Sequence, residues 1–187
     1  RWVAGGSYLM GGGLTGWIAE CPAGPLGETT ARTARVLISR VHLESEDPNA
    51  HDEVWDVGLS ALVSLGTDVY AVGDSTSLPP RGVWIAPAHV KDHSLSHGRI
   101  IAERGVNPQA VRWGERVAVV MLDQDRSRGS LAVGWPLDAM VSADLSTWTP
   151  LPNPDPNMRF HDFDVAADPN GLTVAGLQDL PALADVY

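Results

Sequence analysis

Residues 109–152 read QAVRWGERVAVVMLDQDRSRGSLAVGWPLDAMVSADLSTWTPLP. This stretch contains four short segments that are rich in Val, Trp, Thr and Met and are bounded by Gly, Asp, Ser or Pro, a pattern typical of strands joined by turns. The segments span residues 110–113, 116–122, 139–143 and 147–151. Such a meander cannot bury both of its faces alone, so it predicts further sheets of the same kind elsewhere in the chain.

Similar strand-like segments recur along the chain. Residues 2–7, 70–75, 117–122 and 172–177 resemble one another, and the tripeptide Trp-Ile-Ala occurs at 17–19 and again at 84–86. Hairpin turns are predicted at Gly66, at Gly114 and at Asn170-Gly171, because Gly and Asn tolerate a positive φ. A further strand is expected over residues 35–41, because Val36, Leu37, Ile38 and Val41 favour a strand.

These observations predict an all-β chain without long amphipathic helices. Four strands in each repeat of about 45–70 residues favour a β-propeller built of four-stranded antiparallel blades, of which this chain forms only part of the ring. We expect residues 1–187 to form a single propeller segment, with approximate blades at 1–52, 53–105, 106–157 and 158–187, the first and last incomplete. A β-sandwich with accidental similarity between its strands is the alternative.

Composition narrows the classes of partner. The 187 residues carry a net charge of −10, and Lys91 is the only lysine, so every other cationic residue is an arginine. Lys and Arg do not cluster in the sequence, which argues against binding to duplex nucleic acid. The only cysteine, Cys21, has no internal disulfide partner. No apolar run approaches the roughly 20 residues needed to span a bilayer, so no membrane span is expected. No cofactor is predicted.

The segment from Ser142 to Trp148 reads SADLSTW. It resembles the Asp-box of sialidase-type (BNR-repeat) propellers, although it is one residue shorter and has Ser146 where that pattern has Gly. The resemblance implies a structural turn between the third and fourth strands of a blade. Asp144 would then bind backbone amides, and Trp148 would pack between sheets. The resemblance also favours secretion or a place at the cell surface.

Catalysis does not follow from the same resemblance. Sialidases carry an arginine triad, a tyrosine nucleophile with a glutamate partner, and an Arg-Ile-Pro motif. This sequence contains no Arg-Ile-Pro. We therefore assign no catalytic residue. His89, His93 and His97 are spaced four apart, but we interpret them as surface residues of a loop and not as metal ligands. The acidic stretch 44–53 is interpreted as a solvated loop, and no metal site is assigned.

Tryptophan provides the remaining clue to function. Seven tryptophans are spread along the chain, and most are expected to pack between neighbouring sheets. Trp135 lies in a Gly-Trp-Pro context between two strands, where exposure would allow it to stack on a sugar ring or to anchor a protein. Trp135 is therefore predicted to bind a ligand together with Arg126 and Arg128 of the preceding polar loop.

The sequence thus predicts a non-catalytic recognition module that binds a glycan or a protein partner through loops on one face. Another chain, or sequence outside these residues, would complete the ring. Two alternatives remain at this point, namely a glycoside hydrolase of sialidase type and a structural component of a larger assembly.

Overall fold

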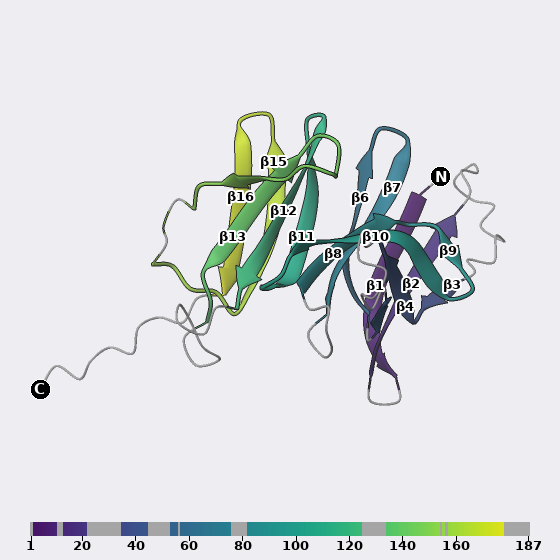
Figure 1. The fold of residues 1–187 in the computed structure, drawn as a ribbon. Helices are drawn as coiled ribbons and strands as arrows, with labels where there is room; N and C mark the ends of the chain where they lie inside the picture. Colours follow the sequence, from purple (N-terminus) through teal and green to yellow (C-terminus); the bar gives the residue numbers. More distant parts are fainter. Residues whose placement is uncertain are drawn as a thin grey trace, which may run out of the picture. The chain divides into compact units, whose positions relative to one another are not determined.

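The chain is all-β, and its sheets are mainly antiparallel (Figure 1). The computed structural model describes residues 2–10, 13–21, 35–44, 53–55, 57–75, 82–124, 134–153, 155 and 157–177. No helix occurs among these residues, and so none of them forms a helix that could cross a membrane. The predicted fold class is thereby confirmed at the level of an all-β chain.

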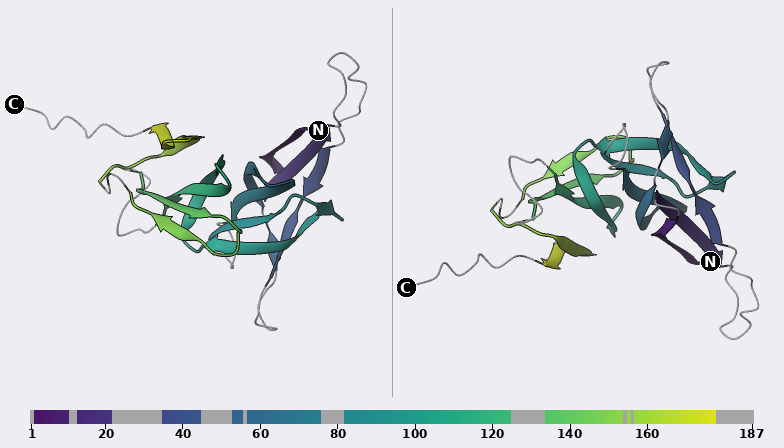
Figure 2. Two further views of the ribbon diagram at one scale, coloured as in Figure 1. Left: turned by 90° about the horizontal axis from the view of Figure 1, so that it is seen from above. Right: turned by 90° about the horizontal axis from the view of Figure 1, so that it is seen from below.

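The chain divides into two compact units, residues 1–103 and residues 104–187. In the first unit, one sheet has the order β1 (Trp2–Met10), β2 (Gly13–Cys21) and β3 (Arg35–Ile38), with both pairings antiparallel. Strands β1 and β2, purple in Figure 2, lie against β6 (Gly58–Leu65) of the second sheet. Gly5 and Gly16 allow this approach, because a Cβ at either position would lie close to the Leu59 side chain.

The second sheet of this unit has the order β5-β4-β10-β8-β7-β6, with β9 paired to β10. Its inner part, from β6 to β10, is a four-stranded antiparallel meander of the type predicted for a blade. The further strands are β4 (Arg40–Leu43), β5 (Glu53–Trp55), β7 (Asp68–Ser75), β8 (Gly82–Pro87), β9 (Val90–Lys91) and β10 (Ser94–Ala102).

The single strand predicted over residues 35–41 is wrong in one respect. Residues 35–38 pair with β2, but β4 pairs in parallel with β10, and Ser39 stands between the two strands. The Ser39 N–H donates to the His93 carbonyl at 2.8 Å, which fixes the point where the chain leaves one sheet for the other. The sequence of residues 35–41 gives no sign of this change of partner strand, because apolar and polar side chains alternate within each of the two strands as they would in one.

The core of the first unit joins both of its sheets around Trp84, whose side chain is fully buried. Ile18 and Ile38 come from the first sheet, whereas Leu59 and Leu95 come from the second. The expectation that tryptophans pack between sheets is therefore confirmed for Trp84.

The second unit contains the stretch that opened the sequence analysis. Strands β11 (Gly105–Trp113), β12 (Arg116–Asp123), β13 (Leu137–Ser142) and β14 (Thr149–Leu151) form a four-stranded antiparallel meander. The central strand β12 is buried from Val117 to Asp123, as its unbroken apolar run requires. Its hairpin with β11 turns at Gly114, where φ is +64°, as predicted.

A separate two-stranded sheet follows, made of β15 (Asp162–Asp168) and β16 (Gly171–Leu177). Its predicted turn is confirmed, since the Asp168 carboxylate accepts the N–H groups of Asn170 and Gly171. Phe163 and Val165 pack with Val106, Val120 and Leu122 in the core of this unit. The third strand expected for this repeat, at residues 185–187, lies outside the described residues.

Gly73 is a position where the packing of the first unit excludes any side chain. A Cβ there would lie 1.8 Å from the Gly58 carbonyl oxygen and 2.4 Å from the Trp84 ring. We expect Gly73→Ala to lower the free energy of unfolding by at least about 2 kcal/mol in chemical denaturation, because backbone and indole must both shift.

Gly171→Ala is the matched control for this change. A Cβ at Gly171 meets nothing within 4 Å, and its φ is not positive, so we expect a change within about 1 kcal/mol. Equal destabilisation by the two variants would contradict the packing described for Gly73.

Candidate functional site

The most concentrated set of ionisable contacts in the described residues lies on the outer strands of the first unit. We call it the polar cluster, and it comprises Arg40, His42, Glu44, Glu53, His97 and Arg99. Its placement follows from alternation along β4. Val41 and Leu43 face the core, so Arg40 and His42 face outward, and Glu44 continues that side.

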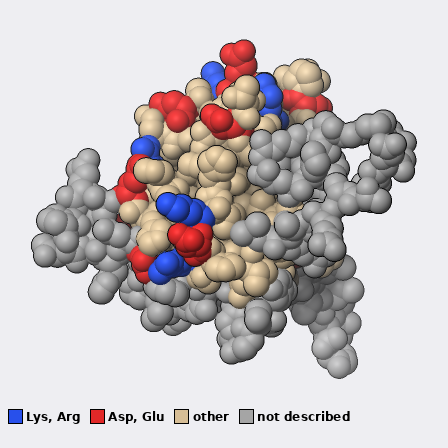
Figure 3. Space-filling model, turned by 90° about the vertical axis from the view of Figure 1, so that its right-hand side faces the viewer, with Lys and Arg blue, Asp and Glu red and all other residues tan. Residues whose placement is uncertain are grey.

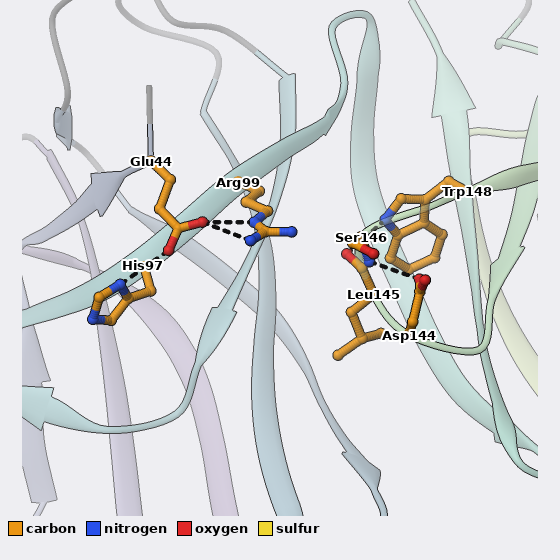
Figure 4. Close-up of polar contacts among 7 residues, drawn as sticks. All are labelled: Glu44, His97, Arg99, Asp144, Leu145, Ser146 and Trp148. Carbon is orange, nitrogen blue, oxygen red and sulfur yellow. Dashed lines mark hydrogen bonds and ion pairs between the residues drawn. The ribbon is translucent and has the colours of Figure 1, made fainter. Parts of the chain in front are cut away.

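Glu44 is the centre of the polar cluster, and Figure 4 shows its carboxylate between the side chains of His97 and Arg99. His97 Nδ1 lies 3.0 Å from Glu44 Oε1. Arg99 Nε donates to Glu44 Oε2 at 2.8 Å, and Arg99 Nη2 lies 2.7 Å from the same oxygen. The Glu44 backbone is also held, because its N–H donates to the Gly98 carbonyl at 2.7 Å. One carboxylate thus orients both an imidazole and a guanidinium.

The backbone of β10 is distorted at His97 to make this contact. The pairing register of β10 with β4 shifts between Leu95 and Gly98, and His97 has a φ of +58°. A positive φ is uncommon for a residue other than glycine, and a bulge of this kind re-aims a side chain. The bulge turns the His97 imidazole towards Glu44, while Leu95 remains in the core.

A second carboxylate repeats the arrangement one strand further out. Glu53 Oε1 lies 3.2 Å from His42 Nδ1 and 3.8 Å from Arg40 Nη1. Each glutamate of the polar cluster therefore contacts one histidine and one arginine. Figure 3 shows the side of the molecule that lies to the right in Figure 1, where acidic and basic side chains stand next to one another. Such a face offers both hydrogen-bond donors and acceptors.

The contacts of Glu44 alter its acidity. The hydrogen bond from Arg99, and then that from His97, lower the pKa of the Glu44 carboxyl below its ordinary value. The carboxylate therefore stays charged further into the acid range than an isolated glutamate. Its contribution to stability is present above the unfolded-state pKa and is lost as the pH falls through the lowered folded pKa. The site is solvent-exposed, so this contribution is reduced by salt.

The three histidines spaced four apart do not form one group. His89 is exposed, and His93 Nδ1 lies 3.2 Å from the Leu37 carbonyl oxygen. Asp92 and His93 have φ values of +50° and +60° and form the two-residue turn between β9 and β10. The loop expected here is therefore partly strand, and His97 lies within β10. Among the described residues, no three His, Cys, Asp or Glu side chains are arranged to hold a metal.

The segment Ser142–Trp148 forms a closely hydrogen-bonded loop between β13 and β14. The Asp144 carboxylate oxygen Oδ1 accepts the Ser146 N–H at 2.9 Å (Figure 4) and the Thr147 N–H at 2.8 Å. Ser142 Oγ accepts the Leu145 N–H at 2.8 Å, and Trp148 Nε1 donates to the Leu145 carbonyl at 3.2 Å. Turns of this kind, in which an Asp side chain binds the following backbone, occur in many folds.

These backbone donors lower the pKa of the Asp144 carboxyl strongly, with Thr147 N–H the largest cause and Ser146 N–H the next. Leu145 adopts a φ of +62° and buries its side chain, so the loop holds a strained residue in place. The arrangement binds the loop's own backbone, and its chemical role is local structure.

Of the three residues predicted to bind a ligand, the structure describes only Trp135. Arg126 and Arg128 lie outside the described residues. Trp135 is half-buried and not in an exposed loop, which corrects the expectation of exposure. Its backbone exchanges hydrogen bonds with Phe160 at 3.0 and 2.9 Å, and its ring packs against the core of the second unit. The ring faces inward because the Trp135 backbone pairs with Phe160, which is distant in sequence.

Sequence reasoning missed the polar cluster. The sequence predicts a solvated loop over residues 44–53 and groups His97 with His89 and His93, so it does not bring Glu44 and His97 together. The available signal was the alternation Arg40-Val-His-Leu-Glu44, which marks an outward polar side on a half-buried strand. The partners on β10 carried no such signal, because they meet Glu44 only through the parallel pairing.

Comparisons with known proteins returned no matching family model, no matching curated protein and no matching solved structure.

The depressed acidity of Asp144 gives a direct prediction. In a carboxyl-carbon NMR titration, we expect the Asp144 signal to remain that of a carboxylate at about pH 3, where an ordinary aspartate is mostly protonated. Asp144→Ala should abolish protection from hydrogen exchange at the Ser146 and Thr147 amides, whereas Asp144→Asn should retain part of it, since its amide oxygen still accepts. Titration of Asp144 in the ordinary range would contradict the geometry.

Proposed function

We propose that this chain forms part of a β-propeller and acts as a non-catalytic recognition module, with the polar cluster as its ligand-contacting surface. The propeller part of the proposal is supported by two successive four-stranded antiparallel meanders. The first runs from β6 through β10 and the second from β11 to β14. Four strands per repeat, joined by short hairpins, are typical of propeller blades.

The observation that carries the recognition proposal is the set of contacts around Glu44. This carboxylate fixes His97 and Arg99 in place, yet all three side chains remain accessible, with exposed fractions of 43%, 75% and 48%. Arg99 Nε and Nη2 contact Glu44, which leaves Nη1 directed away from it in Figure 4. Polar groups that are held before the ligand arrives lose little conformational entropy on binding.

A glycan is the class of ligand that suits this surface best. Sugar hydroxyls both donate and accept hydrogen bonds, and the polar cluster places carboxylates, guanidinium groups and imidazoles side by side on one sheet. Its two arginines and two glutamates balance in charge, which favours a hydroxyl-rich ligand over a strongly charged one. The bulge at His97 is a strained feature of the kind concentrated at functional sites.

Glycan-array binding followed by titration of the retained glycans tests this function. We expect the protein to retain a defined set of glycans, and Glu44→Gln to weaken that binding about tenfold, because His97 and Arg99 lose the charge that orients them. Glu115→Gln is the matched control, since Glu115 is an exposed glutamate in the turn between β11 and β12. This control should bind as the parent protein does.

Two results would overturn the proposal. Either no glycan is retained by the folded protein, or the retained glycans bind equally well to the parent and to Glu44→Gln. Binding of a protein instead of a glycan, with the same sensitivity to Glu44→Gln, would keep the surface but replace the class of ligand.

A further inference from the structure

The far edge of β16 is an unpaired strand edge in the part of the chain that the structure describes. β16 pairs with β15 through residues 171–177 in a register without any shift, and the sheet ends there with two strands. Two-stranded sheets are marginal on their own, and a free edge presents a row of backbone N–H and C=O groups. The β15–β16 hairpin therefore offers a template for a further strand.

Natural proteins usually block such edges, and both edges of the four-stranded sheet in this unit are blocked. β14 carries Pro150, and β11 has Pro108 and a register shift at Asn107, where φ is +48°. By contrast, β16 reads Gly-Leu-Thr-Val-Ala-Gly-Leu and contains no proline, no charge and no bulge. An unprotected edge of this length favours pairing with another strand.

The two faces of the β15–β16 hairpin differ in chemistry. On the inner face, Phe163 and Val165 are buried in the core. On the outer face, Asp162, Asp164 and Asp168 are exposed, and residues 161–177 contain no lysine or arginine to neutralise them. Leu177 shares this outer face and is 70% exposed.

Small side chains separate the free edge from the acidic residues. Opposite Asp164 on β16 lies Ala175, and opposite Ala166 lies Thr173, both exposed. Neighbouring strands are about 4.8 Å apart, so a strand added to β16 would lie about 10 Å from β15. A lysine or arginine side chain on that strand reaches across Ala175 to the Asp164 carboxylate, with its aliphatic stem on the β16 surface.

We propose that β16 is a docking edge that receives an extended peptide strand from a partner, with apolar residues on one side of the strand and basic residues on the other. The backbone bonds of the added strand supply affinity, its apolar residues continue the inner face, and its basic residues meet the aspartates. The docking edge lies on β15 and β16 and shares no residue with the polar cluster, so its test is independent of the test of glycan binding.

The test uses the whole chain, isotope-labelled for NMR, and an N-acetylated peptide of alternating valine with lysine or arginine. Alternate residues of a strand direct their N–H groups to opposite neighbours. We therefore expect the peptide to slow hydrogen exchange at least about tenfold at every second amide of residues 171–177, and not at the amides already paired with β15. A peptide with glutamate in place of the basic residues should bind more weakly.

Asp164→Asn tests the charge requirement and keeps the side-chain acceptor that binds the Val165 N–H. We expect it to weaken binding of the basic peptide about threefold, as one exposed ion pair allows, while Glu115→Gln leaves binding unchanged. If the mutant fails to fold, raising the salt concentration on the parent protein gives the same test, because screening weakens exposed ion pairs.

Three outcomes would overturn the inference. The first is that the basic peptide produces no alternating protection along residues 171–177. The second is that the acidic peptide binds as tightly as the basic one. The third is that the same protection arises without peptide as the protein concentration is raised, which would make a second copy of this chain the occupant of the edge.

Discussion

The polar cluster depends on one constraint, the parallel approach of β4 to β10. The approach is fixed at both ends by backbone hydrogen bonds, from Ser39 N–H to His93 and from Glu44 N–H to Gly98. It also requires Gly98, because a Cβ there would lie 2.5 Å from the Val41 side chain. With the strands this close, the bulge at His97 brings its imidazole to Glu44, and Arg99 meets the same carboxylate. The pairing of the β4 and β10 backbones therefore determines which charged and polar side chains meet.

In the second unit, one feature is held by local interactions and another by interactions between residues distant in sequence. The loop from Ser142 to Trp148 is held by hydrogen bonds between residues two or three apart, so a short sequence specifies it. Trp135 depends on Phe160, which is remote in sequence and pairs with it in an isolated bridge. The polar side chains of the loop bind the loop's own backbone, whereas the Trp135 ring packs against the core. Exposure of an aromatic ring is therefore a poor inference from loop composition.

Much of the strand pattern was predictable, and the failures have physical reasons. The hairpins at Gly66 and Gly114 were found because both turns place a glycine at positive φ. The turn at Asn170-Gly171 was also found, but neither residue has a positive φ, and the Asp168 carboxylate holds this turn. The division of residues 35–41 between two sheets was missed, since strand propensity does not name a partner strand. His97 was misplaced for a related reason, because regular spacing of histidines says nothing about a bulge. Glu44 was visible only as part of an alternating strand, without its partners.

The sequence by itself determined that the chain is all-β, where most strands begin and turn, and which strands alternate between apolar and polar residues. These properties depend on residues close together in the chain, through turn chemistry and the alternation of side chains across a strand. Tertiary structure alone decided that β4 joins β10 in parallel, that Trp135 turns inward and that β16 has no partner besides β15 among the described residues. The first two outcomes depend on contacts between residues more than 20 positions apart, such as Arg40 with Ser94 and Trp135 with Phe160. For β4 and β10, steric fit at Gly98 selects among pairings that the local sequence permits equally.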